Sequence, residues 1–486
     1  MDQRSEQLEG LLNALPTIEA LALARKLETQ RALGQEALPA ETVLAILRPQ
    51  LRRVRPQRVP SLCRLACAGF EDFLVDRVDG PRLPGLIPRS AIAPWWRALE
   101  RMAAEELKIF AADFARLMAA KDSPGLERLG ERLRNAARGW TEAVIAGVES
   151  GKLADAVTRK ALSDIGLQAD IAEIARILAI AEPLCQAIEA VIAVAVRDGH
   201  AQGRRISDFS ADTVTAAKQQ YLRFAEVAGF DSRYFALGLM ARLEHPWFVL
   251  RLGRALSWKP TDALLQDTEL GIIGQRLIHD IDVIVREIEG LMPSHRGRSP
   301  KNADYSRLHR MMSRYIEHSE GMLSEFGFRR DSDWGGHILG TRAALSRALG
   351  RDRLTLVAEA PLALLPQKRG VSARGLASDD PNLDAAPTPE ALEQARSAAK
   401  FLLLLMQKGG RHGLSSPARA TIEELGIEID NRAAKLYDEL ARNPIHEVAA
   451  AQLAAIIKVA ELLFDDGRAA VMMRRLVNMQ RSAAPV

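Results

Sequence analysis

Residues 272–328 read IIGQRLIHDIDVIVREIEGLMPSHRGRSPKNADYSRLHRMMSRYIEHSEGMLSEFGF, and this stretch decides the fold. In its first half, apolar residues recur at steps of four and three: Leu277, Ile281, Ile284, Ile288 and Leu291. This spacing places a narrow apolar seam along one face of a helix, which can pack lengthwise on a second helix. The sequence therefore predicts a long helix that ends before Pro293.

The second half of the stretch predicts another long helix. Its large apolar residues again lie largely on one face: Tyr305, Leu308, Met312, Tyr315, Met322 and Phe326. The short connection between the two helices, residues 294–301, is polar and carries the basic residues Arg296 and Arg298. We therefore expect an αα-hairpin with a positively charged tip.

The composition of the 486-residue chain favours helix throughout. Ala, Leu, Arg and Glu are abundant, whereas aromatic residues make up only 5% of the sequence, so helix formers outweigh strand formers. Only residues 354–358 have the character of a strand, and one strand cannot form a sheet. The predicted fold class is all-α, a multi-helix assembly with the long central αα-hairpin and a smaller C-terminal helical region.

Residues 361–387 are the strongest candidate for a linker, because Pro, Gly, Ser and Asp dominate the segment. The sequence Thr388-Pro389-Glu390 then predicts a helix start, with a capping residue, a first-turn proline and an acidic residue. We expect three parts: a large helical region 1–360, a flexible linker 361–387 and a C-terminal helical region 388–486. The large region could divide further into 1–88 and 89–360.

Charge, cysteine content and hydropathy lead us to expect a cytoplasmic protein. The formal charge of +4 is small for this length, so any attraction to an anionic partner must come from local patches. Three cysteines do not make a disulfide framework. We find no apolar run of the roughly 18–20 residues that cross a bilayer. Residues 126–196 are expected to form several helices, with Pro183 as one of the breaks between them.

The stretch from Arg48 to Arg64 is the densest in positive charge, and three prolines prevent it from forming one continuous helix. It could bind phosphate groups of nucleic acid or an acidic protein. Aromatic side chains that stack on bases are missing from it, which favours the protein. The candidate partner-binding residues are Arg48, Arg52, Arg53, Arg55 and Arg58, together with Arg296 and Arg298 of the hairpin tip.

Two aromatic groups are further candidates for contact with a partner. The adjacent Trp95 and Trp96 could anchor a protein partner, and so could Trp247 within the sequence His245-Pro246-Trp247. In a helical protein such residues more often belong to the core. Both interpretations stay open, so Trp95 and Trp96 are candidates for partner binding or for the core.

The hairpin carries His279, Asp280 and Asp282, a grouping that could act in metal binding or acid–base catalysis. Helical geometry places His279 and Asp282 opposite the apolar seam, where they can face a second neighbour or form a solvated stripe with an Asp282–Arg286 pair. We expect the stripe. His309 and His318 project to opposite flanks of the second helix and cannot hold one ion together.

The remaining chemical motifs also give no site. Cys63 and Cys67 share one helix face, but Cys185 does not complete a zinc or cluster site, and we expect packed core cysteines. The sequence has no P-loop, no G-x-G-x-x-G after a strand and no G-x-S-x-G elbow. We therefore predict no catalytic residue, no cofactor and no metal ligand.

These observations favour a cytoplasmic interaction or scaffold protein that contacts a protein partner, or a second copy of itself. A nucleic-acid-associated factor that uses the Arg48–Arg64 stretch is the first alternative. A helical enzyme, with a site assembled from residues far apart in the sequence, is the second. The sequence favours a protein that is not an enzyme and leaves the question open.

Overall fold

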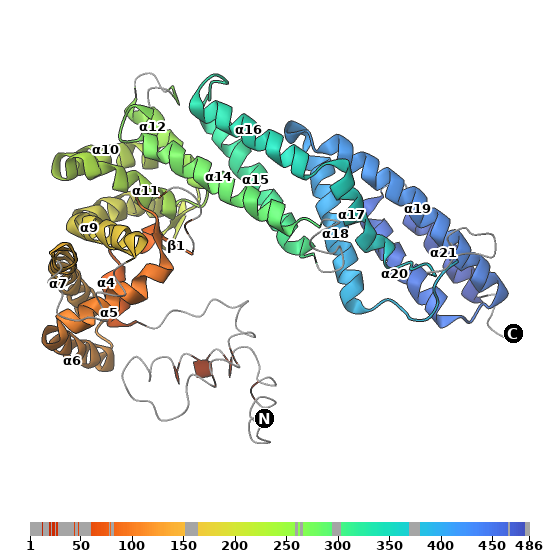
Figure 1. The fold of residues 1–486 in the computed structure, drawn as a ribbon, viewed down its shortest axis with the longest axis horizontal. Helices are drawn as coiled ribbons and strands as arrows, with labels where there is room; N and C mark the ends of the chain where they lie inside the picture. The colour runs from red at the N-terminus through yellow and green to blue at the C-terminus, as the bar shows by residue number, and fades with distance from the viewer. Residues whose placement is uncertain are drawn as a thin grey trace. The chain divides into compact units, whose positions relative to one another are not determined.

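The computed structural model is almost entirely helical, which confirms the all-α fold class (Figure 1). Its strands in the described part are two pairs of two-residue segments. The N-terminal 59 residues are described only at positions 12, 19–20, 22–24, 26–27, 43 and 47. Beyond them the structure describes residues 60–76, 78, 82–150, 164–257, 261–262, 266–293, 303–368, 380–464 and 467–481.

The chain divides into two compact units, residues 1–244 and 245–486. The first unit, unit 1, has these elements: α4 (Leu62–Cys67), η1 (Glu71–Phe73), β1 (Leu74–Val75), β2 (Ile87–Pro88), η2 (Arg89–Ala91), α5 (Ile92–Met102), α6 (Ala104–Ala120), α7 (Ser123–Glu149), α9 (Ile165–Arg197), β3 (Ala201–Gln202), β4 (Arg205–Ile206), α10 (Ala211–Ala228), η3 (Gly229–Ser232) and α11 (Arg233–Arg242).

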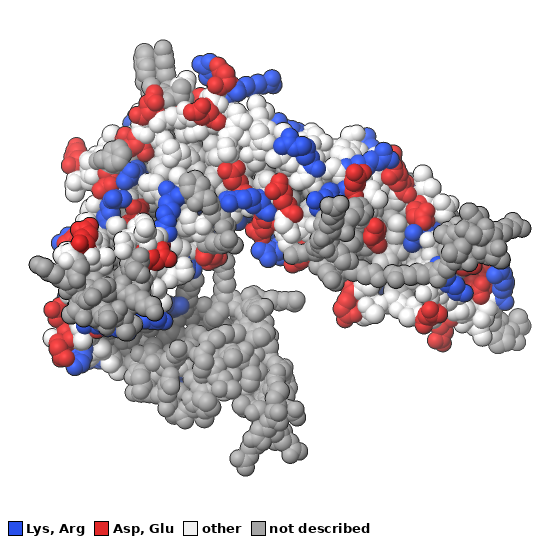
Figure 2. All heavy atoms as spheres, in the orientation of Figure 1, with Lys and Arg blue, Asp and Glu red and all other residues white. Residues whose placement is uncertain are grey.

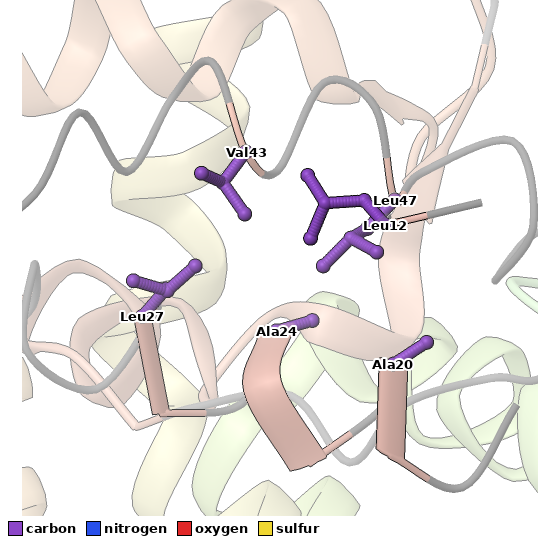
Figure 3. Close-up of a cluster of buried hydrophobic side chains, with 6 residues drawn as sticks. All are labelled: Leu12, Ala20, Ala24, Leu27, Val43 and Leu47. Carbon is purple, nitrogen blue, oxygen red and sulfur yellow. The ribbon is translucent and has the colours of Figure 1, made fainter. Parts of the chain in front are cut away.

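Unit 1 is built around α9, which contacts α7, α10 and α11. The short strands β1 and β2 pair in parallel, and β3 and β4 pair as an antiparallel ribbon after α9. A separate group of buried apolar residues lies near the N-terminus, where Leu12, Val43 and Leu47 face Ala20, Ala24 and Leu27 (Figure 3). The spacing of Ala20, Ala24 and Leu27 places them on one helix face.

Helix α9 corrects two sequence expectations. It continues through Pro183, where we expected a break, and residues on both sides of the proline are buried, among them Leu178, Leu184 and Ile188. A proline costs a helix one hydrogen bond, and burial on both sides outweighs that cost. By length and composition alone, the resulting 33-residue helix is also long and apolar enough to cross a membrane. A core helix meets the same criterion, so α9 is no clear evidence of a membrane span.

The second unit, unit 2, contains the central hairpin and the C-terminal helices. Its elements are η4 (Pro246–Val249), α12 (Leu250–Leu256), α14 (Gly271–Leu291), α15 (Tyr305–Glu325), α16 (Asp333–Ala348), α17 (Arg351–Leu362), α18 (Pro389–Lys408), η6 (Gly410–His412), α19 (Ser415–Arg442), α20 (Glu447–Leu463) and α21 (Arg468–Arg481). Helix α15 contacts α14, α18 and η4, while α17, α18, α19 and α20 form the C-terminal part.

The predicted hairpin is confirmed, because α14 and α15 pack against each other and bury the apolar seam. Two tryptophans determine how α16 and η4 pack against the hairpin. The Trp334 ring of α16 lies against Gly274 of α14, where an added Cβ would meet it at 2.3 Å. The Trp247 ring of η4 lies against Gly321 of α15, where an added Cβ would meet it at 2.2 Å. These two glycines let large rings approach the helix backbone.

Residues 354–358, the expected strand, belong to helix α17 instead. Leu354, Val357 and Ala358 are buried at helical spacing, and α17 packs on α18 and α19. The β-branched Thr355 is accommodated because its hydroxyl donates to the Arg351 carbonyl at 3.0 Å, one turn earlier. Tertiary packing therefore decides this segment against its strand-like composition.

The described ends of the segment 361–387 both belong to unit 2, and the division into three parts stays a prediction. Its described ends are joined, since the Lys368 amide donates to the Asp380 carbonyl at 2.9 Å and the Asn382 amide to the Pro366 carbonyl at 2.8 Å. The predicted start of α18 is confirmed, with the Thr388 hydroxyl accepting from the Ala391 amide at 3.2 Å. Residues 369–379 lie outside the described part.

We predict that Gly321→Ala destabilises the protein by about 2 kcal/mol, because the new methyl group overlaps the buried Trp247 ring. Gly290→Ala is the matched control: Gly290 lies in α14, is exposed and has open space around its Cα. That change should stabilise the protein by about 0.5–1 kcal/mol through helix propensity. Urea unfolding followed by circular dichroism measures both. Equal effects of the two substitutions would contradict the close approach.

We predict that limited proteolysis first cuts between residues 368 and 380, because the Gly, Ser and charged residues there offer little apolar surface to bury. The joined ends of the segment should resist, so cleavage after Asn382 should be slow. Mass spectrometry of the early fragments locates the cuts. First cuts elsewhere in the chain would show that this segment is packed.

Candidate partner-binding site

Most of the predicted partner-binding residues lie outside the described part of the structure. These are Arg48, Arg52, Arg53, Arg55 and Arg58, and also Arg296 and Arg298 of the hairpin tip. Of the Arg48–Arg64 stretch, the last arginine is described, and Arg64 is exposed on α4. The proposed roles of the other residues stay predictions.

The two tryptophans of α5 lie in different surroundings. Trp95 is fully buried, its indole N–H donates to the Thr141 hydroxyl at 3.0 Å, and its ring meets Phe70 edge-on at 5.4 Å. Trp95 is therefore a core residue and offers a partner no accessible surface. Trp96 is half-buried, with its ring centre 5.9 Å from that of Trp95, and keeps an accessible edge. Trp247 is buried too.

The face of α14 that we expected to be solvated is partly covered by a neighbour. His279 is buried, and burial lowers its pKa. The Oδ1 atom of Asp282 lies 2.8 Å from Nε2 of His337 on α16. Arg286 donates to the Asp282 backbone carbonyl at 3.2 Å. The Asp282 carboxylate therefore meets a second helix, while Arg286 and Glu289 stay exposed, so the stripe that we expected is solvated only in part.

The two histidines of α15 lie against different neighbours, as their spacing predicted. His318 is buried beside Trp247 of η4, with ring centres 5.3 Å apart, and burial lowers its pKa to about 4. His309 is half-buried and faces the charges of α18. Among the described residues no group of three or more His, Cys, Asp or Glu side chains could hold a metal ion.

Polar contacts hold α15 parallel to α18 in a fixed register. The Gln394 side chain donates to the Ala303 carbonyl at 2.8 Å, and the Ser306 and Ser397 hydroxyls lie 2.9 Å apart. Both pairs have the same sequence separation, 91 residues. One turn further along, the same separation places Lys400 of α18 beside His309 of α15.

This register brings together three cations that the sequence keeps apart. We define the basic strip as Arg310 of α15 with Lys400 and Lys408 of α18, all of them exposed. None of the three forms an ion pair with a carboxylate in the described part of unit 2. Burial lowers the pKa of His309, and the charges of Lys400, Arg310 and Lys408 lower it further. Among the described residues the charges that shift the pKa of His309 are all positive, so this histidine lies in a positive potential.

The strip differs from the general surface, where positive and negative side chains are interspersed on the face shown in Figure 2. Elsewhere in unit 2 many arginines have partners, such as Arg251 with Glu325 and Arg307 with Glu287 at 2.6 Å. Exposed cations without partners can bind an anionic group without first breaking an ion pair. Sequence reasoning missed the strip because only the register of two distant helices assembles it.

A cavity of about 390 Å³ in unit 1 is the other polar region, bounded by Arg82, Asp164 and Asp170 among others. Arg82 forms an ion pair with the buried Asp170, whose pKa is raised by burial, so these two charges neutralise each other. Nearby, Glu173 accepts hydrogen bonds from the Gly85 amide at 2.6 Å and the Tyr234 hydroxyl at 2.7 Å. These hydrogen bonds tie the β1–β2 loop and α11 to α9, which is a structural role.

Beyond the basic strip, η6 places His412 in the core of unit 2. The ring is buried, its centre lies 5.1 Å from that of Tyr315, and neither ring nitrogen has a hydrogen-bond partner. Burial lowers the pKa of His412 to about 4, and the charges of Arg342 and Arg411 act in the same direction. The nearest carboxylate, that of Glu320, is 4.0 Å away. His412 is therefore held neutral in an environment that resists its protonation.

No protein family model, no curated protein and no solved structure matches this chain.

We predict that His412 makes the protein acid-sensitive. Its folded pKa of about 4 lies below the ordinary 6.5, so its contribution is complete above pH 6.5 and is lost as the pH falls towards 4. His412→Leu should reduce the loss of unfolding free energy between about pH 7 and pH 5 by about 2 kcal/mol. Urea unfolding at both pH values measures this, and packing changes cancel in the difference. An unchanged pH dependence would contradict the prediction.

Proposed function

We propose that the chain is a helical interaction protein that binds an acidic segment of a protein partner through the basic strip. A cytoplasmic location and a role without catalysis belong to the same proposal. The observation that supports it best is the set of three exposed cations, Arg310, Lys400 and Lys408, without carboxylate partners in the described structure. Unpaired surface charge of one sign steers and orients a partner of the opposite sign.

The surroundings of the strip suit a helix-lined protein contact. On α18, Leu403 and Gln407 lie on the same helix face as Lys400, at three and seven residues' distance. Leu403 is half-buried and Gln407 is exposed. The face therefore combines cations, an amide and some apolar surface, which is the usual mixture at the rim of a protein interface.

The nearby aromatic residues argue against single-stranded nucleic acid as the partner. Tyr305 and Tyr315 of α15 and Phe401 of α18 are buried. Their rings are therefore unable to stack on bases, which is the interaction that supplements phosphate binding in single-strand recognition. A strip of three cations also binds fewer phosphates than specific duplex binding proteins do.

Association with nucleic acid stays the alternative, because the Arg48–Arg64 stretch is the densest positive segment of the sequence. Binding of phosphates by that stretch would make the affinity fall steeply with salt. Replacing Arg52, Arg53, Arg55 and Arg58 with Ala should then flatten the salt dependence, by about one unit for each phosphate that is no longer bound.

The test compares ligands at low and at moderate salt. A fluorescent Glu-rich peptide, a single-stranded RNA and a duplex DNA are each titrated with the full chain. We expect the peptide to bind best, and the combined change Arg310→Ala, Lys400→Ala and Lys408→Ala to weaken that binding roughly ten-fold, since each exposed charge contributes about 0.5 kcal/mol.

A matched control removes the same charge elsewhere in unit 2: Arg330→Ala, Arg347→Ala and Lys458→Ala change exposed residues outside the strip. This control should bind the peptide like the unchanged protein. Equal weakening by the two triple variants would show that net charge, and not the strip, is responsible. Tighter binding of RNA or DNA, abolished by changing the Arg52–Arg58 arginines, would establish the alternative.

A further inference from the structure

Two of the three cysteines lie together at the surface of unit 1. Cys63 and Cys67 are four residues apart on α4, so their side chains share one helix face. Cys63 is half-buried, Cys67 is buried, and the two thiols lie close enough for each to shift the pKa of the other. A half-buried thiol beside a buried one is the arrangement of an attacking and a resolving cysteine.

A hydrogen bond makes the two thiols chemically different. The Cys67 S–H donates to the Cys63 sulfur, which lowers the pKa of Cys63 against the opposing effects of burial and Glu100. The same bond, together with burial, raises the pKa of Cys67. Cys63 is therefore the sulfur that ionises first, and it is also the one that a reagent can reach.

We propose that Cys63 and Cys67 form a redox-active dithiol that small-molecule disulfides of the glutathione class convert into an intramolecular disulfide. The Cys63 thiolate attacks one sulfur of the reagent, forming a mixed disulfide and releasing one reagent thiolate. Once Cys63 is in the mixed disulfide, its hydrogen bond to Cys67 no longer raises the pKa of Cys67; Cys67 gives its proton to the released thiolate and attacks the Cys63 sulfur, releasing the second thiolate. The reagent gains two electrons and the two cysteines lose them.

The geometry of a helix permits this bond at a structural cost. Positions i and i+4 place their Cα atoms about 6 Å apart, within the range that disulfides span. Their Cβ atoms lie about 5–6 Å apart, whereas a disulfide brings them to about 4 Å, so the last turn of α4 must tighten. Helix α4 packs on α7, and its Leu65 side chain lies near Gly130. Oxidation therefore alters the packing of α4 on α7 in unit 1.

The third cysteine provides an internal comparison. Cys185 lies on α9 and is half-exposed, and burial raises its pKa, with Arg134 and Arg204 acting against that effect. No second thiol is among the groups that shift its pKa. At neutral pH we expect Cys63 to react with a small disulfide at least roughly ten-fold faster than Cys185, because the thiolate is the reacting form.

The test incubates the reduced full chain with glutathione disulfide, followed by alkylation and peptide mass spectrometry. In the unchanged protein we expect the peptide holding Cys63 and Cys67 to lose two hydrogen atoms and to carry no glutathione. Cys67→Ser should instead accumulate glutathione on Cys63, because no resolving thiol remains. Cys63→Ser should leave Cys67 alkylatable, and Cys185→Ser should behave like the unchanged protein.

Circular dichroism of each variant verifies that it is folded. The proposal is overturned if Cys63 and Cys67 stay alkylatable while Cys185 reacts, or if glutathione remains on Cys63 in the unchanged protein. It is also overturned if Cys67→Ser does not trap the mixed disulfide. A Cys63→Ala variant repeats the second arm should the serine disturb α4. Reduction with excess glutathione must restore both thiols.

Discussion

Unit 2 depends on how closely bulky rings can approach the backbones of the hairpin helices. Trp334 meets α14 at Gly274 and Trp247 meets α15 at Gly321, where any side chain would overlap the ring. Packing at this distance fixes how η4 and α16 are oriented on the hairpin and where along its helices they lie, because protein interiors tolerate few voids and little overlap. The position of η4 and α16 around the hairpin follows from these two close approaches.

The same close packing explains why the polar groups inside unit 2 stay neutral. His318 lies beside Trp247 and His412 beside Tyr315, and burial lowers both pKa values to about 4. Neither His412 nitrogen has a hydrogen-bond partner among the described residues, and the Glu320 carboxylate is 4.0 Å away. Aromatic contact and burial favour the neutral ring, so protonation would place a charge where burial penalises it.

The sequence predicts well the features that depend on local spacing. The hairpin seam and the Thr388 cap of α18 both follow from residues within a few turns of one another. Predictions failed where residues distant in the sequence decide the outcome. Helix α9 continues through Pro183 because residues on both sides are buried, and packing on α18 and α19 makes residues 354–358 helical. His337 of α16 contacts Asp282 on the face of α14 that was expected to be solvated.

The basic strip shows the same limit for the site. Arg310 and Lys400 are ordinary residues in the sequence, and it is the parallel register of α15 and α18 that sets them beside His309. The densest basic stretch of the sequence, in contrast, is a candidate by composition alone. The backbones of two packed helices set the positions of these cations, so binding an anionic group there requires ordering of their side chains only. The proposal of an acidic partner therefore rests on the basic strip and not on the composition of one stretch.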